Sequence, residues 1–286
     1  MNKPESEDEE AANIETKNKA LLAGPFLVWT VAFIAIPLLM VIYYGFTGDD
    51  GSFTLENVKR IPGPHYLKSL WLALLLSLVS TVACLVMSYP LAMILSKLKG
   101  NKSQLIVLIF IIPMWMNFLL RTMAWQTLLE KNGVINTVLR FLHLPTLRII
   151  NTPYAIILGM IYNFLPFMLL PIYNSLIKVD LSVIQAAEDL EANNFQTFTK
   201  VIFPLTLPGV ISGITMVFVP AMTTFVLSDL LGGSKILLIG NVIEQQFKQV
   251  NNWHMGSGLS LVLMIFIAIS MAIMNKYDKE GKGASF

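Results

Sequence analysis

Charged residues near the ends of apolar stretches are the first candidates for binding a solute. A charge at the centre of a membrane helix costs about 2.5 to 3.5 kcal/mol on insertion scales, so each one needs a reason. Asp229 stands just before Gly232 and Gly233, and its carboxylate could attract a cationic amine. Glu244, in the segment NVIEQQF, could do the same. For both carboxylates the alternative is a structural role, such as capping a loop or pairing with a lysine.

Aromatic and amide side chains in two other apolar stretches could line a path for the same solute. Aromatic rings attract cations through their faces, and the residues concerned are Trp115, Trp125, Tyr162 and Asn163. Such residues in membrane helices usually serve packing, which is the alternative. Arg121, between the two tryptophans, has the wrong sign for a cationic solute. We therefore expect Arg121 to form a structural pair, with a partner subunit as one source of its counter-charge.

Other kinds of chemistry lack the residue patterns that they need. The run Gly-Gly-Ser-Lys at 232–235 does not have the spacing of a phosphate-binding loop. His65, His143 and His254 have no second ligand at metal spacing, and no nucleophile, base and orienting group occur together. The sequence therefore predicts no enzyme activity, no metal site and no cofactor on this chain.

Composition places these residues in a polytopic membrane protein. The 286 residues are 55% hydrophobic and only 13% charged, which excludes an ordinary soluble domain. A net charge of +2 is too small to indicate nucleic-acid binding. A helix of about 20 residues crosses the hydrocarbon layer of roughly 30 Å. Six segments are long and apolar enough, and we predict an all-α fold with six transmembrane helices at about 22–46, 70–95, 105–129, 154–177, 209–231 and 256–274.

Lysine and arginine residues near the span ends predict the orientation of the chain. More of them lie on the inside when both termini are cytoplasmic, most clearly in the loop SKLKGNKSQ. We expect a disordered acidic cytoplasmic tail at 1–21, a first span with its outer loop at 22–66, a transport domain at 67–275 and a cytoplasmic tail at 276–286. Gly209 and Gly213 favour close helix packing, with a turn around Pro208 as the alternative.

A polar insert at 180–208 separates the fourth and fifth predicted spans. Val183, Ala187 and Leu190 share one helical face, while Gln185, Glu188, Asp189 and Glu191 occupy the other sides. A second short helix would place Phe195, Phe198 and Ile202 at helical spacing. Such a helix suits the groove of a soluble partner. The alternative is a surface helix that only covers the span ends.

The insert resembles a cytoplasmic motif of the permease subunits of binding-protein-dependent ABC importers. That motif reads Glu-Ala-Ala, then Gly four residues after the second Ala, then Ile-x-Leu-Pro. The aligned residues here are Gln185, Ala186, Ala187, Glu191, Val201, Phe203 and Pro204. The spacing matches throughout, and the residue types depart at Gln185 and Glu191.

The departure at Glu191 bears on the local structure of the insert. Glycine reaches positive φ without strain and so supplies the turn between the two short helices. We expect Glu191 not to adopt that conformation. Asn193 or Asn194 would then take it instead and lengthen the first helix by about half a turn. Gln185 retains hydrogen-bonding capacity but lacks the charge of the usual glutamate.

The resemblance implies a type I ABC importer permease fold over about 67–275. The runs at 151–176 and 228–247, with WHMGSGLSL near Trp253, are most similar to spermidine/putrescine-type permeases. The resemblance further implies polyamine import by alternating access in the cell membrane. The implied partners are an ABC ATPase that holds ATP and Mg²⁺, a second homologous permease and an extracellular substrate-binding protein. The implied ATPase-coupling residues are Val183, Gln185, Ala186, Ala187, Glu188, Asp189, Leu190, Glu191, Phe195 and Pro204.

Three alternatives to this function remain open from the sequence. The chain could transport another small solute, such as an amino acid, a sugar or an anion. A secondary transporter driven by an ion gradient is less consistent with the sequence, because such proteins tend to show repeats and ionisable residues near the membrane midplane. The chain could also be a membrane scaffold that recruits a cytoplasmic protein through the same insert.

Overall fold

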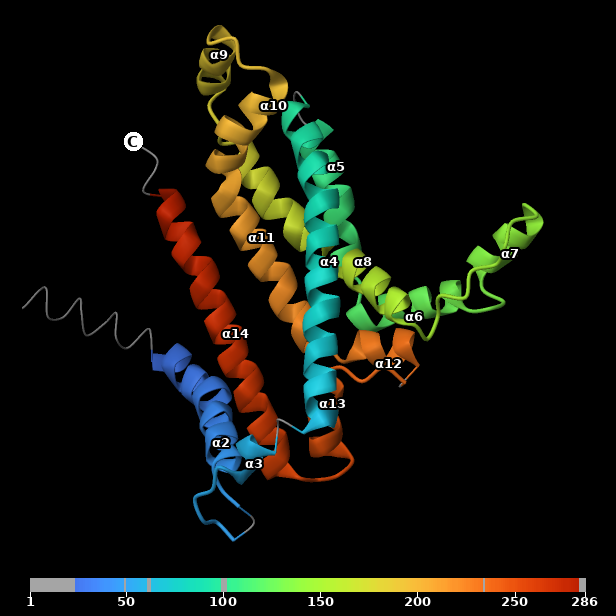
Figure 1. Ribbon diagram of the computed structural model, residues 1–286, viewed down its shortest axis with the longest axis vertical. Helices are drawn as coiled ribbons and strands as arrows, with labels where there is room; N and C mark the ends of the chain where they lie inside the picture. The colour runs from blue at the N-terminus through green and yellow to red at the C-terminus, as the bar shows by residue number, and fades with distance from the viewer. Residues whose placement is uncertain (1–23, 49, 61–62, 99–101, 234, 283–286) are drawn as a thin grey trace, which may run out of the picture. The chain divides into compact units, whose positions relative to one another are not determined.

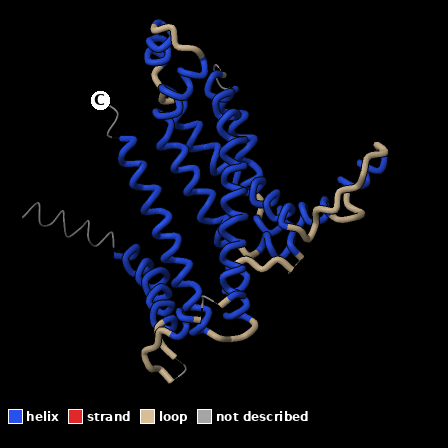
Figure 2. The backbone as a smooth tube through the Cα atoms, in the orientation of Figure 1, coloured by secondary structure: helices blue, strands red, loops and turns tan. Residues whose placement is uncertain are grey.

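The computed structural model describes residues 24–48, 50–60, 63–98, 102–233 and 235–282 (Figures 1 and 2). These residues form helices and loops, with one isolated β-bridge between Thr47 and Phe53. In this described part, five helices are long and apolar enough to cross a membrane, and a bent pair would make a sixth span. The predicted all-α fold with six spans is therefore confirmed, with one span broken. The predicted acidic tail at 1–21 lies outside the described residues.

Internal contacts divide the chain into two units, which we describe separately. The first unit comprises 1–60 and 252–262, and the second comprises 61–251 and 263–286. The first unit holds the span Gly24–Gly45, which contains the π-helix η1 (Val31–Ala35) and α2 (Ile36–Gly45). It also holds α3 (Glu56–Lys59) and the first turns of α14 (Trp253–Lys282).

Asn57 ties the end of the first span to the other parts of the first unit. Its side-chain amide donates hydrogen bonds to the carbonyls of Gly45 and Thr47, at 3.3 Å and 3.0 Å. Gly45 lies against Leu261 of α14, and a Cβ on Gly258 would approach Cβ of Asn57 to 3.0 Å. The two glycines therefore permit the close approach of α2, α3 and α14.

Three long helices form the centre of the second unit: α4 (Pro64–Lys97), α8 (Pro153–Leu176) and α11 (Phe203–Thr223). The helix α8 carries no charged residue and is apolar on every side, as expected of a helix that is buried among others. Its fully buried side chains include Ile156, Met160, Met168, Leu169 and Ile172. The predicted spans at 70–95 and 154–177 match α4 and α8.

Two glycines set the distance between α8 and α11. A Cβ on Gly209 would meet Ser175 Oγ and would lie 2.5 Å from the carbonyl oxygen of Pro171. A Cβ on Gly213 would lie 2.7 Å from Met168 Sδ. The interpretation of these glycines as a packing pair is therefore confirmed. Pro208 lies inside α11, so the alternative of a turn at that proline is wrong.

The predicted third span, 105–129, is not one straight helix. It consists of α5 (Lys102–Ile111), the 3₁₀-helix η2 (Ile112–Trp115) and α6 (Phe118–Leu129). The two arms, Leu105–Trp115 and Phe118–Phe141, meet at 94°. Pro113 removes a backbone donor just before the break, and Asn117 caps the new helix by accepting from the N–H of Leu119 at 2.8 Å. A proline followed by a capping residue ends one helix and begins another. The second arm continues into α7 (Val134–Phe141).

The predicted fifth span, 209–231, begins and ends too late. The helix runs without interruption from Asn194 to Thr223, through α10 (Asn194–Thr197), the π-helix η3 (Phe198–Ile202) and α11. Pro204 is the second residue of α11, which directly follows the π-helix, so the helix continues through it although it has no N–H to donate. The chain then breaks at Thr224 and forms α12 (Val226–Gly232) and α13 (Ile239–Lys248). The sixth predicted span, 256–274, corresponds to α14.

Candidate functional site

The polar insert folds as α9 (Leu181–Asp189) followed by a tight turn into α10. Asp180 caps α9, because its Oδ1 accepts a hydrogen bond from the backbone N–H of Ser182 at 2.9 Å. This bond to the ionised carboxylate holds the pKa of Asp180 below its ordinary value. The helices α9 and α10 lie together at one end of α8 and α11 (Figure 1).

The face of α9 that was predicted to meet a partner is uncovered. Leu190 is 83% exposed and Val183 is 43% exposed, while Phe195 of α10 is 74% exposed. Ala187 is half-buried on the same helix. Large apolar side chains that their own chain leaves open in a polar segment indicate a contact surface. The remaining predicted coupling residues are also exposed: Gln185, Ala186, Glu188, Asp189, Glu191 and Pro204.

Glu191 adopts the left-handed conformation, contrary to the sequence prediction. Its φ is 59°, whereas Asn193 has φ of −75°. The N–H of Ala192 bonds the carbonyl of Ala187 at 3.0 Å, and the N–H of Glu191 bonds that of Glu188 at 2.9 Å. These two bonds form a Schellman motif, which satisfies the last carbonyls of a helix. The hydrogen bonds of the turn therefore override the residue preference, and α9 is not lengthened.

Asn193 has a different role from the one predicted. Its Oδ1 accepts from the N–H of Gln196 at 2.8 Å, and Gln196 Oε1 accepts from the N–H of Asn193 at 3.0 Å. This reciprocal pair is a capping box that begins α10. The predicted second short helix, with Phe195, Phe198 and Ile202, is thus the start of the long helix that ends at Thr223.

Two of the predicted path residues are in contact. The rings of Trp125 in α6 and Tyr162 in α8 have centroids 5.1 Å apart in an edge-to-face arrangement. The neighbouring Asn163 is 1% exposed and donates to the carbonyl of Gly159 at 2.8 Å. Its Oδ1 has no hydrogen-bond partner among the described residues. Trp115 lies on the other arm of the broken span and is 81% exposed.

Arg121 is buried without a hydrogen-bond partner for its Nε among the described residues. The side chain is 8% exposed and belongs to α6, one turn before Trp125. The predicted structural pair is therefore not seen within the described part of the chain, and a partner subunit stays a prediction.

The two candidate carboxylates lie on neighbouring short helices outside the spans. Asp229 of α12 accepts a hydrogen bond from Asn241 Nδ2 at 2.7 Å, and Asn241 also bonds the carbonyl of Phe225. Burial, followed by the charge of Glu244, raises the pKa of Asp229 above its ordinary value. Glu244 pairs with Lys248 at 2.8 Å across one turn of α13. The amide of Asn241, and not a lysine, is thus the hydrogen-bonding partner of Asp229.

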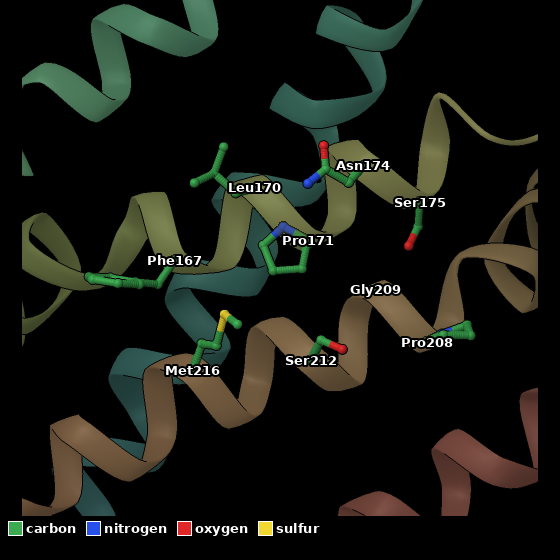
Figure 3. A pocket seen from close by; sticks show the side chains of 9 residues that line it. All are labelled: Phe167, Leu170, Pro171, Asn174, Ser175, Pro208, Gly209, Ser212 and Met216. Atoms are coloured by element: carbon green, nitrogen blue, oxygen red, sulfur yellow. The ribbon is translucent and has the colours of Figure 1, made fainter. Parts of the chain in front are cut away.

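A groove between α8 and α11 was not predicted from the sequence. It has a volume of about 450 Å³ and lies beside the close contact at Gly209 (Figure 3). Its polar groups come from Asn174, Ser175 and Ser212. The sequence gives no clear signal for it, because the groove depends on how α8 and α11 pack against each other. The other lining residues are Phe167, Leu170, Gly209 and Met216.

The described residues contain no group of three or more His, Cys, Asp or Glu side chains that could hold a metal ion. The described residues form instead a membrane bundle in which the short helix α9 leaves apolar side chains exposed. It offers a surface for a partner and aromatic contacts between its helices, and it offers no constellation for bond-making chemistry.

Comparison with known proteins agrees with this geometry. The family model described as "Binding-protein-dependent transport system inner membrane component" matches residues 12–279. The chain is 37% identical over 275 residues to the "Spermidine/putrescine transport system permease protein PotB" of Haemophilus influenzae, covering 93% of this chain and 96% of that one. It is 41% identical over 253 residues to the protein of the same name from Escherichia coli, covering 86% and 92%.

The fold is also that of a solved transporter. The structure described as "bacterial alginate ABC transporter in complex with alginate pentasaccharide-bound periplasmic protein" matches with a TM-score of 0.77. It covers 95% of this chain and 96% of the matching one at 14% identity. At that identity the match shows the permease fold alone.

Proposed function

This chain belongs to the family of binding-protein-dependent transport system inner membrane components, and we propose that it carries polyamines such as spermidine and putrescine into the cell. As a multi-pass membrane permease of an ABC importer it is not itself an enzyme and carries no cofactor, and ATP is bound by a partner ATPase. The substrate proposal rests on one observation: identity of about 40% to spermidine/putrescine permeases extends over most of both chains.

The site residues suit a cationic substrate. Trp125 and Tyr162 present adjoining aromatic rings, which bind cations through their faces. Asn163 has a buried Oδ1 that accepts no hydrogen bond from the described residues, and an ammonium group is a donor. In this proposal Asp229 and Glu244 attract a polyamine before it enters the path. Neither carboxylate lies within a span, which fits a role at the entrance.

The exposed apolar face of α9 supports contact with the ATPase. In this proposal α9 lies in the cytoplasm, both termini are cytoplasmic, and the transport domain occupies about 67–275. Val183, Ala187 and Leu190 fill a groove of the ATPase, and closure of the ATPase dimer displaces α9. The spans then alternate between outward-open and inward-open arrangements. A second homologous permease and an extracellular substrate-binding protein complete the importer.

A reconstituted complex tests both parts of the proposal. We expect Ala187→Asp to abolish substrate-stimulated ATP hydrolysis and uptake, because a charge at the centre of an apolar contact is costly to desolvate. Leu144→Asp is the matched control, since it places the same charge at a side chain that is 51% exposed and lies outside α9. Retention of coupled uptake in the Ala187 variant would contradict the coupling role.

The substrate is tested in the same vesicles. Spermidine and putrescine should be taken up with ATP and should compete with each other. An amino acid, a sugar or an anion should not compete. Uptake that persists without ATP and collapses when the ion gradient is dissipated would identify a secondary transporter instead.

A further inference from the structure

The helix that leads from the coupling segment into the fifth span contains a widened turn. Over Phe198–Ile202 the backbone forms a π-helix, in which the N–H of Phe203 bonds the carbonyl of Phe198. Pro204 has no N–H to offer the carbonyl of Lys200 four residues earlier, which explains why the ordinary pattern fails here. Such π turns are rare and often mark functional sites. A turn that has lost an ordinary backbone bond is a place where a push on α9 and α10 could be absorbed.

Tyr89 of α4 contacts this helix at the first residue of the widened turn and at the residue that follows the turn. Its ring packs edge-to-face on Phe198, where the turn begins, with centroids 5.5 Å apart. The same ring lies 5.9 Å from Phe203, just after the turn ends. Phe198 and Phe203 are themselves 6.1 Å apart. Tyr89 is 7% exposed, so one buried ring spans the turn from its first residue to the residue that follows it.

The hydroxyl of Tyr89 adds a directional contact beyond the turn. It lies 2.7 Å from Thr206 Oγ1 in a buried environment. Thr206 Oγ1 also lies 2.9 Å from the carbonyl of Ile202, which can only accept. Because Thr206 has one hydroxyl hydrogen and uses it on that carbonyl, Tyr89 is the donor in the bond between them. The phenol thereby joins α4 to the first turn of α11.

We propose that Tyr89 is a positioning residue that stiffens the π turn, so that displacement of the coupling segment moves α4 and α11 together. The inference rests on the proposed coupling role of α9 and α10. Without the hydroxyl of Tyr89, the widened turn deforms when the ATPase displaces α9 and α10, and α11 moves less. ATP is then hydrolysed at an unchanged rate while less substrate crosses per ATP.

The experiment measures substrate transported per ATP hydrolysed in the reconstituted complex. Tyr89→Phe keeps the ring contacts and removes the hydrogen bond, and we expect the ratio to fall about two- to tenfold. Thr206→Val should cause at least the same loss, because it removes this bond together with the bond from Thr206 to the carbonyl of Ile202. The double variant should lose no more than Thr206→Val alone, since the bond to Tyr89 is already absent there. The KM for ATP and the rate of ATP hydrolysis should stay unchanged, which a general loss of packing would not produce.

Tyr173→Phe is the matched control. Tyr173 and Ser103 form another buried hydroxyl pair at 2.7 Å, between α8 and α5, and neither residue belongs to the π turn. This variant should keep the wild-type ratio, and a fall equal to that of Tyr89→Phe would overturn the inference. A wild-type ratio in both Tyr89→Phe and Thr206→Val would also overturn it. If Tyr89→Phe and Thr206→Val keep the wild-type ratio of transport to ATP hydrolysis while Ala187→Asp abolishes uptake, only the role of Tyr89 fails. If the wild type shows no ATP-driven uptake, the proposed function itself fails.

Discussion

The N–H of Ala192 bonds the carbonyl of Ala187 at 3.0 Å and closes the turn after α9 around a left-handed glutamate. The turn keeps its backbone hydrogen bonds around Glu191. A residue with a Cβ is nevertheless disfavoured by roughly 1–2 kcal/mol in the left-handed conformation relative to the right-handed one. Glycine does not have this penalty, although it loses more conformational entropy on folding.

We therefore expect Glu191→Gly to stabilise the turn by about 1 kcal/mol. Hydrogen exchange at the amide of Ala192 should slow accordingly. Ala192→Gly is the control, because Ala192 does not have positive φ and the change should weaken the turn. Faster exchange in the Glu191 variant would contradict this account of the motif.

Gly209→Ala should destabilise the packing of α8 on α11. The added methyl group would meet Ser175 Oγ and the carbonyl oxygen of Pro171, and overpacking of this kind costs about 1–3 kcal/mol. The thermal unfolding midpoint of the purified complex measures the effect. Adding Ser175→Gly should recover only part of the loss, because the Pro171 carbonyl remains. Gly24→Ala, where the methyl group meets nothing within 4 Å, should leave the midpoint unchanged.

The cap of α9 should weaken in acid. The pKa of Asp180 is lower in the folded chain than its ordinary value of 3.8, so its contribution to stability is present above that value. The contribution is lost as the pH falls through the folded pKa, because protonation removes the acceptor charge. Hydrogen exchange at Ser182, corrected for the intrinsic rate, should therefore accelerate below pH 4. Asp180→Asn keeps a capping oxygen and should remove the pH dependence.

Trp125→Ala should weaken the binding of a polyamine in the path. Loss of one cation–π contact corresponds to about a two- to fivefold rise in the KM for spermidine. Trp125→Phe should recover part of the affinity, since it restores a ring beside Tyr162. Trp71→Ala removes a tryptophan that is 65% exposed on α4 and should leave the KM unchanged. Equal effects at Trp71 and Trp125 would argue against a specific path residue.

Hydrophobic periodicity in the sequence predicted the helices that are apolar throughout. It failed to predict where a helix continues through a proline and where it breaks near one. Pro204 and Pro208 lie within one continuous helix, in which a π turn closely precedes Pro204. Pro113, by contrast, precedes a true break, because Asn117 can cap a new helix there. The prolines by themselves do not distinguish these outcomes, since each outcome depends on which neighbouring groups satisfy the freed backbone groups.

The sequence likewise predicted some features of the candidate site and not others. The amphipathic pattern of α9 follows from helical spacing alone, whereas the exposure of Val183 and Leu190 is seen only in the structure. The conformation of Glu191 does not follow from its residue type, because residue preference is a weaker term than two well-formed backbone bonds. The contact between Trp125 and Tyr162 depends on the tertiary packing of α6 and α8, and their positions in the sequence give no sign of it.

The bend after Trp115 has a consequence for the surroundings of the chain. The arm Leu105–Trp115 has 11 residues, of which four form the 3₁₀-helix η2. With rises of 1.5 Å per α-helical and about 2.0 Å per 3₁₀ residue it extends about 18 Å, which is well short of a hydrocarbon layer of roughly 30 Å. The carbonyl of Met116 and the N–H of Asn117, which bond no other backbone group of the described residues, therefore lie partway through the bilayer. The hydrocarbon chains of lipids cannot form hydrogen bonds with such groups. This corner of the permease must border water or another polypeptide, so lipid is excluded from it.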